Sequence, residues 1–312
     1  MIRLLAPRLV QAGFVALVVG ALTFALMRLL PGDMAYRIAA GRYGYDLVST
    51  EAAQAVRAEL GLDAPGWLAF GRWLMDILTL DLGRSLVSGA PVVEELSHQL
   101  GASVFLAASA LLLSFLIGPP LGFLAGRRAG GALDRASLLA SVVLRALPPF
   151  VLGLVLILVF SSTLGLLPSA GYGGWAHTVL PAATLALGLV AVSSRVARDA
   201  AVETRAAPFY AFGRLKGLPR RQLFARHGLR NASVPIVTHL GVQFAFLIEG
   251  VVVVETLFAW PGIGHALVHA IVERDVPMVQ GAALAMGLIF VALNAAIDLL
   301  NARLDPRART IA

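Results

Sequence analysis

The sequence contains no cysteine and comparatively few charges. Without cysteine in its 312 residues, the chain has neither a disulfide framework nor a thiolate metal site. Charged residues make up 14% of the chain and hydrophobic residues 58%, whereas soluble domains are about 25% charged and about 45–50% apolar. The mean hydropathy is +0.82. This composition indicates an integral membrane protein, with an all-α fold.

Lysine is almost absent as well. Lys216 is the single lysine among 25 basic residues, and Gly217 follows it. A phosphate-binding P-loop needs a lysine followed by serine or threonine, so the chain has no Walker-type ATP site. An intramembrane enzyme is not expected either, because no HExxH or GxSxG motif is present. We expect neither a cofactor nor a catalytic residue here; if ATP drives the work, partner subunits bind the ATP and its Mg²⁺.

Six apolar stretches are long enough to cross a hydrocarbon core, which needs about 20 helical residues. They lie at residues 9–30, 102–125, 138–164, 179–194, 235–258 and 279–300. The first is too long for the apolar part of a signal peptide, so a retained span is expected. The segments predicted from this pattern are an N-terminal part with the first span (1–30), an outer helical subdomain (31–99), a five-helix membrane core (100–302) and a tail (303–312).

Basic residues gather on alternate links between the spans. Three arginines lie between residues 127 and 135, and nine basic residues lie between 195 and 230. Residues 33–95, in contrast, hold nine acids and five arginines. This alternation is the positive-inside pattern and predicts that both termini are cytoplasmic. It also accounts for the net charge of +7, so no nucleic-acid partner is expected.

The basic segment 195–234 is expected to form a compact cytoplasmic projection. The residues from Lys216 to Pro219 are typical of a helix stop and turn. Residues 210–215 fit a short helix before the turn, and residues 220–231 fit a second helix that ends ahead of Pro235. Gly213 is expected to weaken the first helix by about 1 kcal/mol relative to alanine. Such a projection can fit a groove on a partner.

Charges and prolines inside the apolar stretches indicate candidate pathway positions. Arg145 precedes Pro148 and Pro149, which lack backbone donors and kink the third span; such breaks either line transport pathways or are purely structural. Glu249 lies inside the fifth span and Glu255 near its end. Charges within spans are costly and default to functional hypotheses. We expect Arg145 and Glu249 to form a structural pair or to contact cargo.

Two histidines raise the question of a metal. His265 and His269 are four residues apart on an expected short helix, which can present both rings to one ion. No third ligand is evident in the sequence. The pair is therefore a weak candidate, and no metal site is expected.

Several motifs follow one another along the chain. They are residues 28–33 (RLLPGD), 80–85 (LDLGRS), 214–218 (RLKGL), 226–232 (RHGLRNA), 255–264 (ETLFAWPGIG) and 298–307 (DLLNARLDPR). With these motifs the chain resembles inner-membrane permeases of bacterial ATP-binding-cassette (ABC) importers, in the peptide, opine and nickel uptake family. One departure is residues 212–214, where the family usually has Thr-Ala-Arg and this chain has Phe-Gly-Arg.

The resemblance implies one half of a pore in the bacterial inner membrane. A homologous second permease would supply the other half of the pore. Two ABC ATPase subunits would drive transport by hydrolysing ATP, and a periplasmic or lipid-anchored substrate-binding protein would deliver the solute. The projection would dock on an ATPase subunit around Gly217, and Glu255 would hold an outer gate. The residues implied in coupling to the ATPase are Tyr210, Phe212, Gly213, Arg214, Lys216, Gly217, Leu218, Arg226, Arg230 and Asn231.

The solute is predicted from finer similarities. Residues 170–175 and 229–233 look more like nickel permeases than dipeptide permeases, so nickel or a nickel chelate is expected. A di- or oligopeptide substrate stays open as the alternative within the family. A secondary transporter working without ATPase subunits is the alternative from another class, although such proteins usually show internal repeats that are not evident here.

Overall fold

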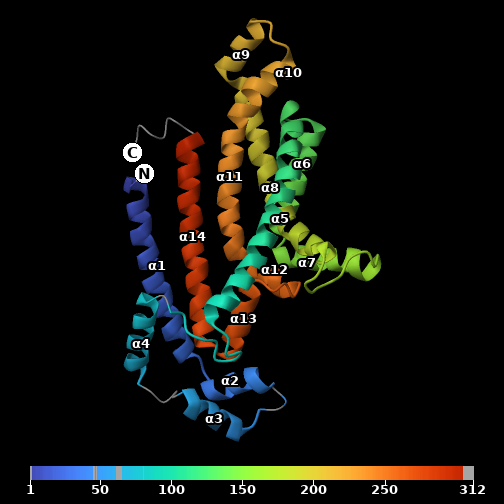
Figure 1. The fold of residues 1–312 in the computed structure, drawn as a ribbon. Coiled ribbons are helices and arrows are strands. Elements are labelled where there is room, and N and C mark those ends of the chain that lie inside the picture. Colours follow the sequence, from blue (N-terminus) through green and yellow to red (C-terminus); the bar gives the residue numbers. More distant parts are fainter. Residues whose placement is uncertain (1, 45, 47, 61–64, 80, 305–312) are drawn as a thin grey trace. The chain divides into compact units, whose positions relative to one another are not determined.

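The computed structural model describes residues 2–44, 46, 48–60, 65–79 and 81–304. The named elements in these ranges are all helices (Figure 1), and one isolated antiparallel bridge joins Arg84 and Pro91. The predicted all-α fold is confirmed. The chain divides into two compact units. Unit 1 comprises residues 1–103 and 261–292, and unit 2 comprises residues 104–260 and 293–312.

Unit 1 contains the N-terminal helix and the small helices that follow it. Its elements are α1 (Ile2–Leu29), α2 (Met34–Tyr43), α3 (Thr50–Leu60), α4 (Gly66–Leu78), α13 (Ile263–Glu273) and the first parts of α5 (Val92–Arg127) and α14 (Val276–Leu304). Helix α2 begins where the side chain of Asp33 accepts a 2.9 Å hydrogen bond from the Ala35 amide. Ile38 and Val56, both fully buried, pack α2 and α3 together.

Asp275 fixes the start of α14 in unit 1. Its carboxylate accepts hydrogen bonds from the backbone amides of Leu86 and Met278, at 3.1 and 3.3 Å, and from the Ser85 hydroxyl. Asp275 is 2% exposed. A buried carboxylate is tolerated only with such donors, so this residue joins the link before α5 to the link before α14.

Unit 2 is built around the long helix α8 (Trp175–Ala206). Its other elements are α6 (Ala132–Ala146), α7 (Pro149–Leu156), a π-helical stretch (Ile157–Thr163), α9 (Pro208–Leu215), α10 (Arg220–Leu223), a second π-helical stretch (Phe224–Gly228), α11 (Leu229–Gly250), α12 (Val252–Leu257) and the remaining parts of α5 and α14. Helix α5 approaches α8 closely, because Gly122 and Gly126 lie against its backbone; a Cβ at Gly126 would lie 3.0 Å from the Arg198 carbonyl oxygen.

Within the described part of the chain, four helices are long and apolar enough to span a membrane. These stretches are Pro7–Leu29, Val92–Arg127, Trp175–Ala206 and Val276–Leu299. Helices α6 and α7 make a fifth if they are one broken span. The fifth predicted span, residues 235–258, lies on α11 and α12, and it includes side chains outside the described part of the chain. A polytopic α-helical membrane protein is therefore confirmed, while the number six stays a prediction.

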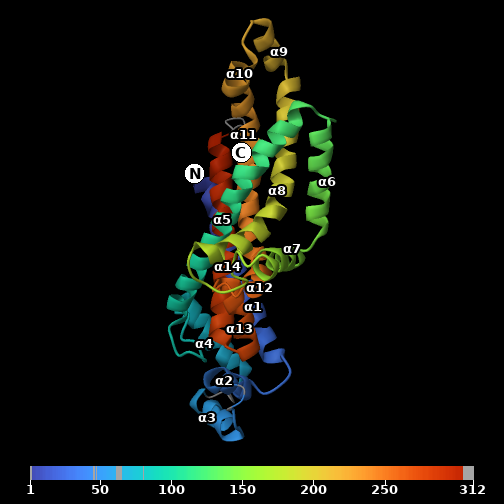
Figure 2. The same cartoon turned by 90° about the vertical axis from the view of Figure 1, so that its right-hand side faces the viewer.

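The predicted interruption of the third span is sharper than a kink. The chain bends by 103° between α6 and the stretch Pro149–Thr163, which comprises α7 and the π-helical residues after it, and Figure 2 shows this bend. Leu147 is extended, at φ −88° and ψ 129°, as is usual for a residue before proline. Pro149 opens α7, where its missing N–H costs nothing. The two prolines thus end one helix and begin another.

The helices around the basic segment differ from those predicted. Helix α8 continues to Ala206, so residues 195–206 are helical and are not part of a loop. The second predicted short helix does not end ahead of Pro235, because residues 220–250 run on through α10, the π-helical stretch and α11. A proline inside a helix costs about 3 kcal/mol. Here α11 packs along α8, and this packing keeps the helix intact through Pro235.

Candidate functional site

A projection that we name the knob, residues 208–223, forms the end of unit 2 opposite to α7 (Figure 1). Pro208 is the first residue of α9. The helix ends in a Schellman arrangement: Gly217 has φ +78°, its amide donates to the Arg214 carbonyl at 3.0 Å, and the Leu218 amide donates to the Gly213 carbonyl at 3.3 Å. Glycine suits this left-handed position because it has no Cβ.

The inner face of α9 explains the glycine at position 213. A Cβ there would collide with Leu223 Cδ1, and Leu223 is 1% exposed. Tyr210 is also buried, and its ring lies beside Gly228. The expectation that Gly213 merely weakens α9 is therefore incomplete, because its lack of a side chain lets α9 and α10 pack together.

The outer face of α9 is apolar and exposed. Phe209, Phe212 and Leu215 follow one another at a spacing of three residues, and Leu215 is 85% exposed. The Lys216 ammonium lies 4.6 Å from the centre of the Phe212 ring. An exposed apolar patch with a basic rim is typical of a protein-docking surface.

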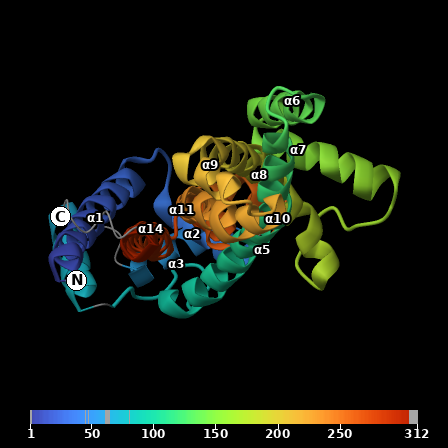
Figure 3. The same cartoon turned by 90° about the horizontal axis from the view of Figure 1, so that it is seen from above.

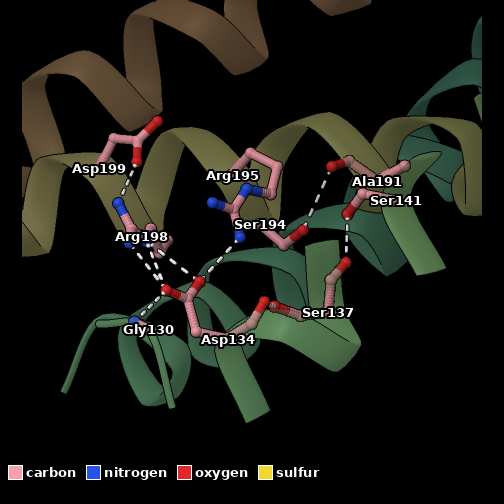
Figure 4. A network of polar contacts seen from close by, with 9 residues as sticks. All are labelled: Gly130, Asp134, Ser137, Ser141, Ala191, Ser194, Arg195, Arg198 and Asp199. Carbon is pink, nitrogen blue, oxygen red and sulfur yellow. Dashed lines mark hydrogen bonds and ion pairs between the residues drawn. The ribbon is translucent and has the colours of Figure 1, made fainter. Parts of the chain in front are cut away.

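A buried ion cluster joins α6 to α8 below the knob (Figure 4). Asp134, which is 5% exposed, accepts hydrogen bonds from Arg198 at 2.7 Å, from Arg195 at 3.0 Å and from the Gly130 amide at 2.9 Å. Arg198 also pairs with the exposed Asp199 at 2.9 Å. The cluster fixes the start of α6 to the part of α8 that leads into the knob.

A pocket of about 510 Å³ lies further along the same helices. Its polar residues are Arg145 from α6, Thr184 from α8, and His239 and Gln243 from α11. The remaining lining residues are Leu144, Leu147, Pro149, Leu152, Leu185, Gly188, Leu189, Val192, Val242 and Leu247. The buried atoms Nε2 of His239 and Oε1 of Gln243 have no hydrogen-bond partner among the described residues. An apolar pocket with a few polar groups has the character of a ligand site.

Two family models match the chain. Residues 118–310 match the inner membrane component of binding-protein-dependent transport systems, and residues 1–105 match the N-terminal part of such membrane components. The chain belongs to this family of transport permeases. The resemblance in its motifs is thereby confirmed, and the permease is a multi-pass protein of the inner membrane in an ABC importer. The alternative of a secondary transporter without ATPase subunits is set aside.

The relatives that the permease matches are named as components of transport systems. It is 37% identical to a peptide transport system permease protein of Brucella abortus, over 99% of both chains. It is 36% identical to the glutathione transport system permease protein of Pectobacterium atrosepticum, over 94% of both chains. The crystal structure of an amino acid ABC transporter with histidines shares the fold, with a TM-score of 0.54 and 16% identity, over 68% of the permease and 94% of that chain.

The predicted pathway residues lie at different places in the permease. Arg145 and Pro149 line the pocket, and Pro148 is the cap residue of α7. Glu255 is fully buried on α12. Glu249 belongs to α11, but its side chain lies outside the described residues. Sequence reasoning missed His239 and Gln243, which stand four residues apart on α11; this spacing was the available signal that they share a face.

The predicted coupling residues do not all belong to the knob. Those from Tyr210 to Leu218 lie on α9 and its turn. Arg226 is on the second π-helical stretch, and Arg230 and Asn231 are on α11. All three are exposed, and Asn231 Nδ2 donates to the His227 carbonyl at 2.7 Å. They form the exposed side of the helix that leads from the knob back into unit 2.

The histidine pair lies on α13 of unit 1. The rings of His265 and His269 are 4.6 Å apart, edge to face. Burial lowers the pKa of His265, and the neighbouring His269 lowers it further. In the part of the chain that the structure describes, no group of three His, Asp or Glu side chains could hold a metal. The pair stays a weak candidate.

Proposed function

We propose that the permease imports short peptides and forms one half of their pathway through the membrane. A homologous second permease completes the pathway, two ATPase subunits bind ATP and Mg²⁺, and a substrate-binding protein delivers the peptide. Both termini face the cytoplasm, as the alternating charges indicate. The knob then lies on the side where ATPase subunits bind.

The pocket at Arg145 carries this proposal. Its volume of about 510 Å³ falls within the range of ligand sites, about 300–1,000 Å³. Arginine can hold a carboxylate through two parallel hydrogen bonds, and every unmodified peptide has a terminal carboxylate. The Gln243 and His239 groups can exchange hydrogen bonds with a peptide's amides, which relieves the cost of leaving buried polar atoms unpaired.

The names of the relatives support peptide over nickel. The relatives reported above are named for peptide and glutathione transport. The prediction of nickel or a nickel chelate rested on short similarities at residues 170–175 and 229–233, and the pocket offers one histidine rather than the several soft or borderline ligands that nickel favours. The peptide alternative therefore replaces nickel as the proposed substrate.

The geometry also supports a route from the knob to the pocket. Helix α8 carries one wall of the pocket, the arginines of the ion cluster, and then α9. A force on the knob therefore acts on one continuous helix that also holds α6. Closure of the ATPase pair would bias the pocket between two access states by this route.

Uptake by cells tests the substrate. Cells lacking this permease are compared with complemented cells for uptake of labelled glutathione, a labelled dipeptide and nickel ions. We expect the deletion to abolish peptide uptake and complementation with Arg145→Gln to restore it poorly. Binding of the peptide to the substrate-binding protein is measured in parallel, so that a loss of binding to that protein is distinguished from a loss of transport through the permease. Loss of nickel uptake with unchanged peptide uptake would contradict the proposal.

A further inference from the structure

A second pocket of unit 2, which we name the arginine pocket, lies at the base of the knob. It measures about 1,010 Å³ and is lined by α5, α8, α9 and the second π-helical stretch. Figure 3 shows the molecule from above, with α8, α9 and α10 gathered at this end of unit 2. The lining residues are Pro120, Phe123, Leu124, Arg127, Arg128, Ala201, Arg205, Tyr210, Arg214 and Phe224.

The charged side chains that line this pocket are all positive. Arg127 is the last residue of α5, Arg128 directly follows it, Arg205 belongs to the last turn of α8, and Arg214 belongs to α9. No acidic residue lines the pocket, and none of its arginines forms an ion pair with a described carboxylate. Arg205 is held in place by a 3.1 Å hydrogen bond from Nη1 to the Gly126 carbonyl. Four guanidinium groups around one space make a site for phosphate oxygens.

The floor of the arginine pocket is apolar and continues along α5. Phe123 and Phe224 meet edge to face at 5.6 Å on this floor, beside Leu124. Leu112, Leu116 and Leu124 are each at least half exposed and stand at multiples of four residues along α5. The distance from Leu112 to Leu124 is about 18 Å of helix at about 1.5 Å per residue. Such a stripe is long enough to cross one leaflet of the hydrocarbon core, because a leaflet is about 15 Å thick.

We propose that the arginine pocket binds an anionic phospholipid. The headgroup phosphate lies among Arg127, Arg128 and Arg214, and an acyl chain runs down the leucine stripe of α5. Basic pockets between membrane helices on the cytoplasmic side suit such headgroups. An acidic surface of a partner protein would match the arginines, but it would leave the apolar stripe inside the span without a role. The bound lipid would touch α9 at Tyr210 and Arg214 and so support the base of the knob.

Lipid titration of the purified full-length permease tests the proposal. The permease in neutral detergent is titrated with phosphatidylglycerol, with phosphatidylcholine and with inorganic phosphate, and bound molecules are counted by native mass spectrometry. The pocket variant is Arg127→Gln/Arg128→Gln. Its matched control, Arg135→Gln/Arg226→Gln, removes the same charge from two exposed arginines outside the pocket. Leu124→Asn keeps every arginine and alters the stripe.

We expect one phosphatidylglycerol to bind at least about tenfold more tightly than phosphatidylcholine. The pocket variant should lose this preference, the control should keep it, and Leu124→Asn should weaken it. Equal losses in the pocket and control variants, or no effect of Leu124→Asn, would overturn the proposal. Binding of inorganic phosphate as tight as that of the lipid would make the pocket a site for small anions. Displacement of the lipid by added ATPase subunits would make it a protein-docking surface and would equally overturn the proposal.

Discussion

Asp134 of α6 accepts a hydrogen bond of 2.7 Å from Arg198 of α8, and the two side chains are the centre of the ion cluster in unit 2. Their positions are 64 residues apart in the chain. The bond joins the helix that carries Arg145 to the helix that leads into the knob. It therefore connects the pocket at Arg145 to the knob, the two regions proposed to communicate.

Removal of the Asp134 charge should destabilise unit 2. The variant Asp134→Asn leaves the partly buried Arg195 without its counter-charge and Arg198 with only the exposed Asp199, and breaking a buried pair in this way costs about 3–5 kcal/mol. Asp199→Asn is a matched control, because Asp199 pairs with the same Arg198 but is 66% exposed, and such pairs contribute about 0–1 kcal/mol. Thermal unfolding of the purified permease measures both. Equal melting temperatures for the two variants would contradict the assigned role of Asp134.

Gly213→Ala should harm the knob, although alanine favours helices. Helix propensity alone predicts a gain of about 1 kcal/mol. The added Cβ would instead collide with Leu223, and overpacking of this kind costs about 1–3 kcal/mol. We expect reduced uptake with a normal amount of permease in the membrane. The double variant Gly213→Ala/Leu223→Ala should recover part of the uptake, whereas full activity of the single variant would show that the collision is harmless.

Gly217 should tolerate only residues that accept a left-handed backbone. Apart from Gly217 and its two chain neighbours, no atom of the described residues lies within 4 Å of a Cβ built there, so the constraint comes from its φ of +78°. Proline cannot adopt this angle, whereas asparagine does so at modest cost. Gly217→Pro should therefore abolish ATP-driven uptake while the permease stays in the membrane, and Gly217→Asn should retain most of it. ATPase activity of the assembled importer, measured with and without substrate, separates lost coupling from lost assembly.

The α2–α3 pair should weaken in acid. Burial alone would raise the pKa of Asp33, but hydrogen bonds from the Ala35 amide and from Arg57 outweigh it and lower the pKa below its usual 3.8. A carboxyl group whose pKa is lower in the folded state stabilises the fold at pH values above its unfolded-state pKa. This stabilisation is lost as the pH falls through the folded-state pKa. Hydrogen exchange of α2 should accelerate below about pH 4.

Two variants separate the parts of this effect. Asp33→Asn keeps the helix cap and loses the ion pair with the half-exposed Arg57, which costs at most about 1 kcal/mol. Asp33→Ala also loses the cap, for about 1 kcal/mol more. Neither variant should show the acid-dependent step. If Asp33→Asn retains that step, another group is responsible.

Much of the fold could be predicted because a protein that inserts into a membrane needs patterns of apolar and basic residues that can be read along its sequence. The apolar stretches and the alternation of basic links depend on composition along the chain, and neither needs a contact between distant residues. Pro148 and Pro149 likewise predict an interruption wherever they occur in a helix. The angle of that interruption could not be predicted, since the packing of α6 and α7 against α8 decides it.

The sequence by itself determined the membrane class, the family motifs and the segment that forms the knob. Only the tertiary structure decided which side chains meet. Arg145 lines a pocket with His239 and Gln243, which no spacing in the sequence indicated, while its pairing with Glu249 stays a prediction because the Glu249 side chain lies outside the described residues. Gly213 looked like a weak position and proved to be a packing requirement. Asp134 carried no local signal at all, since its two arginines reach it from α8 only after the helices have packed.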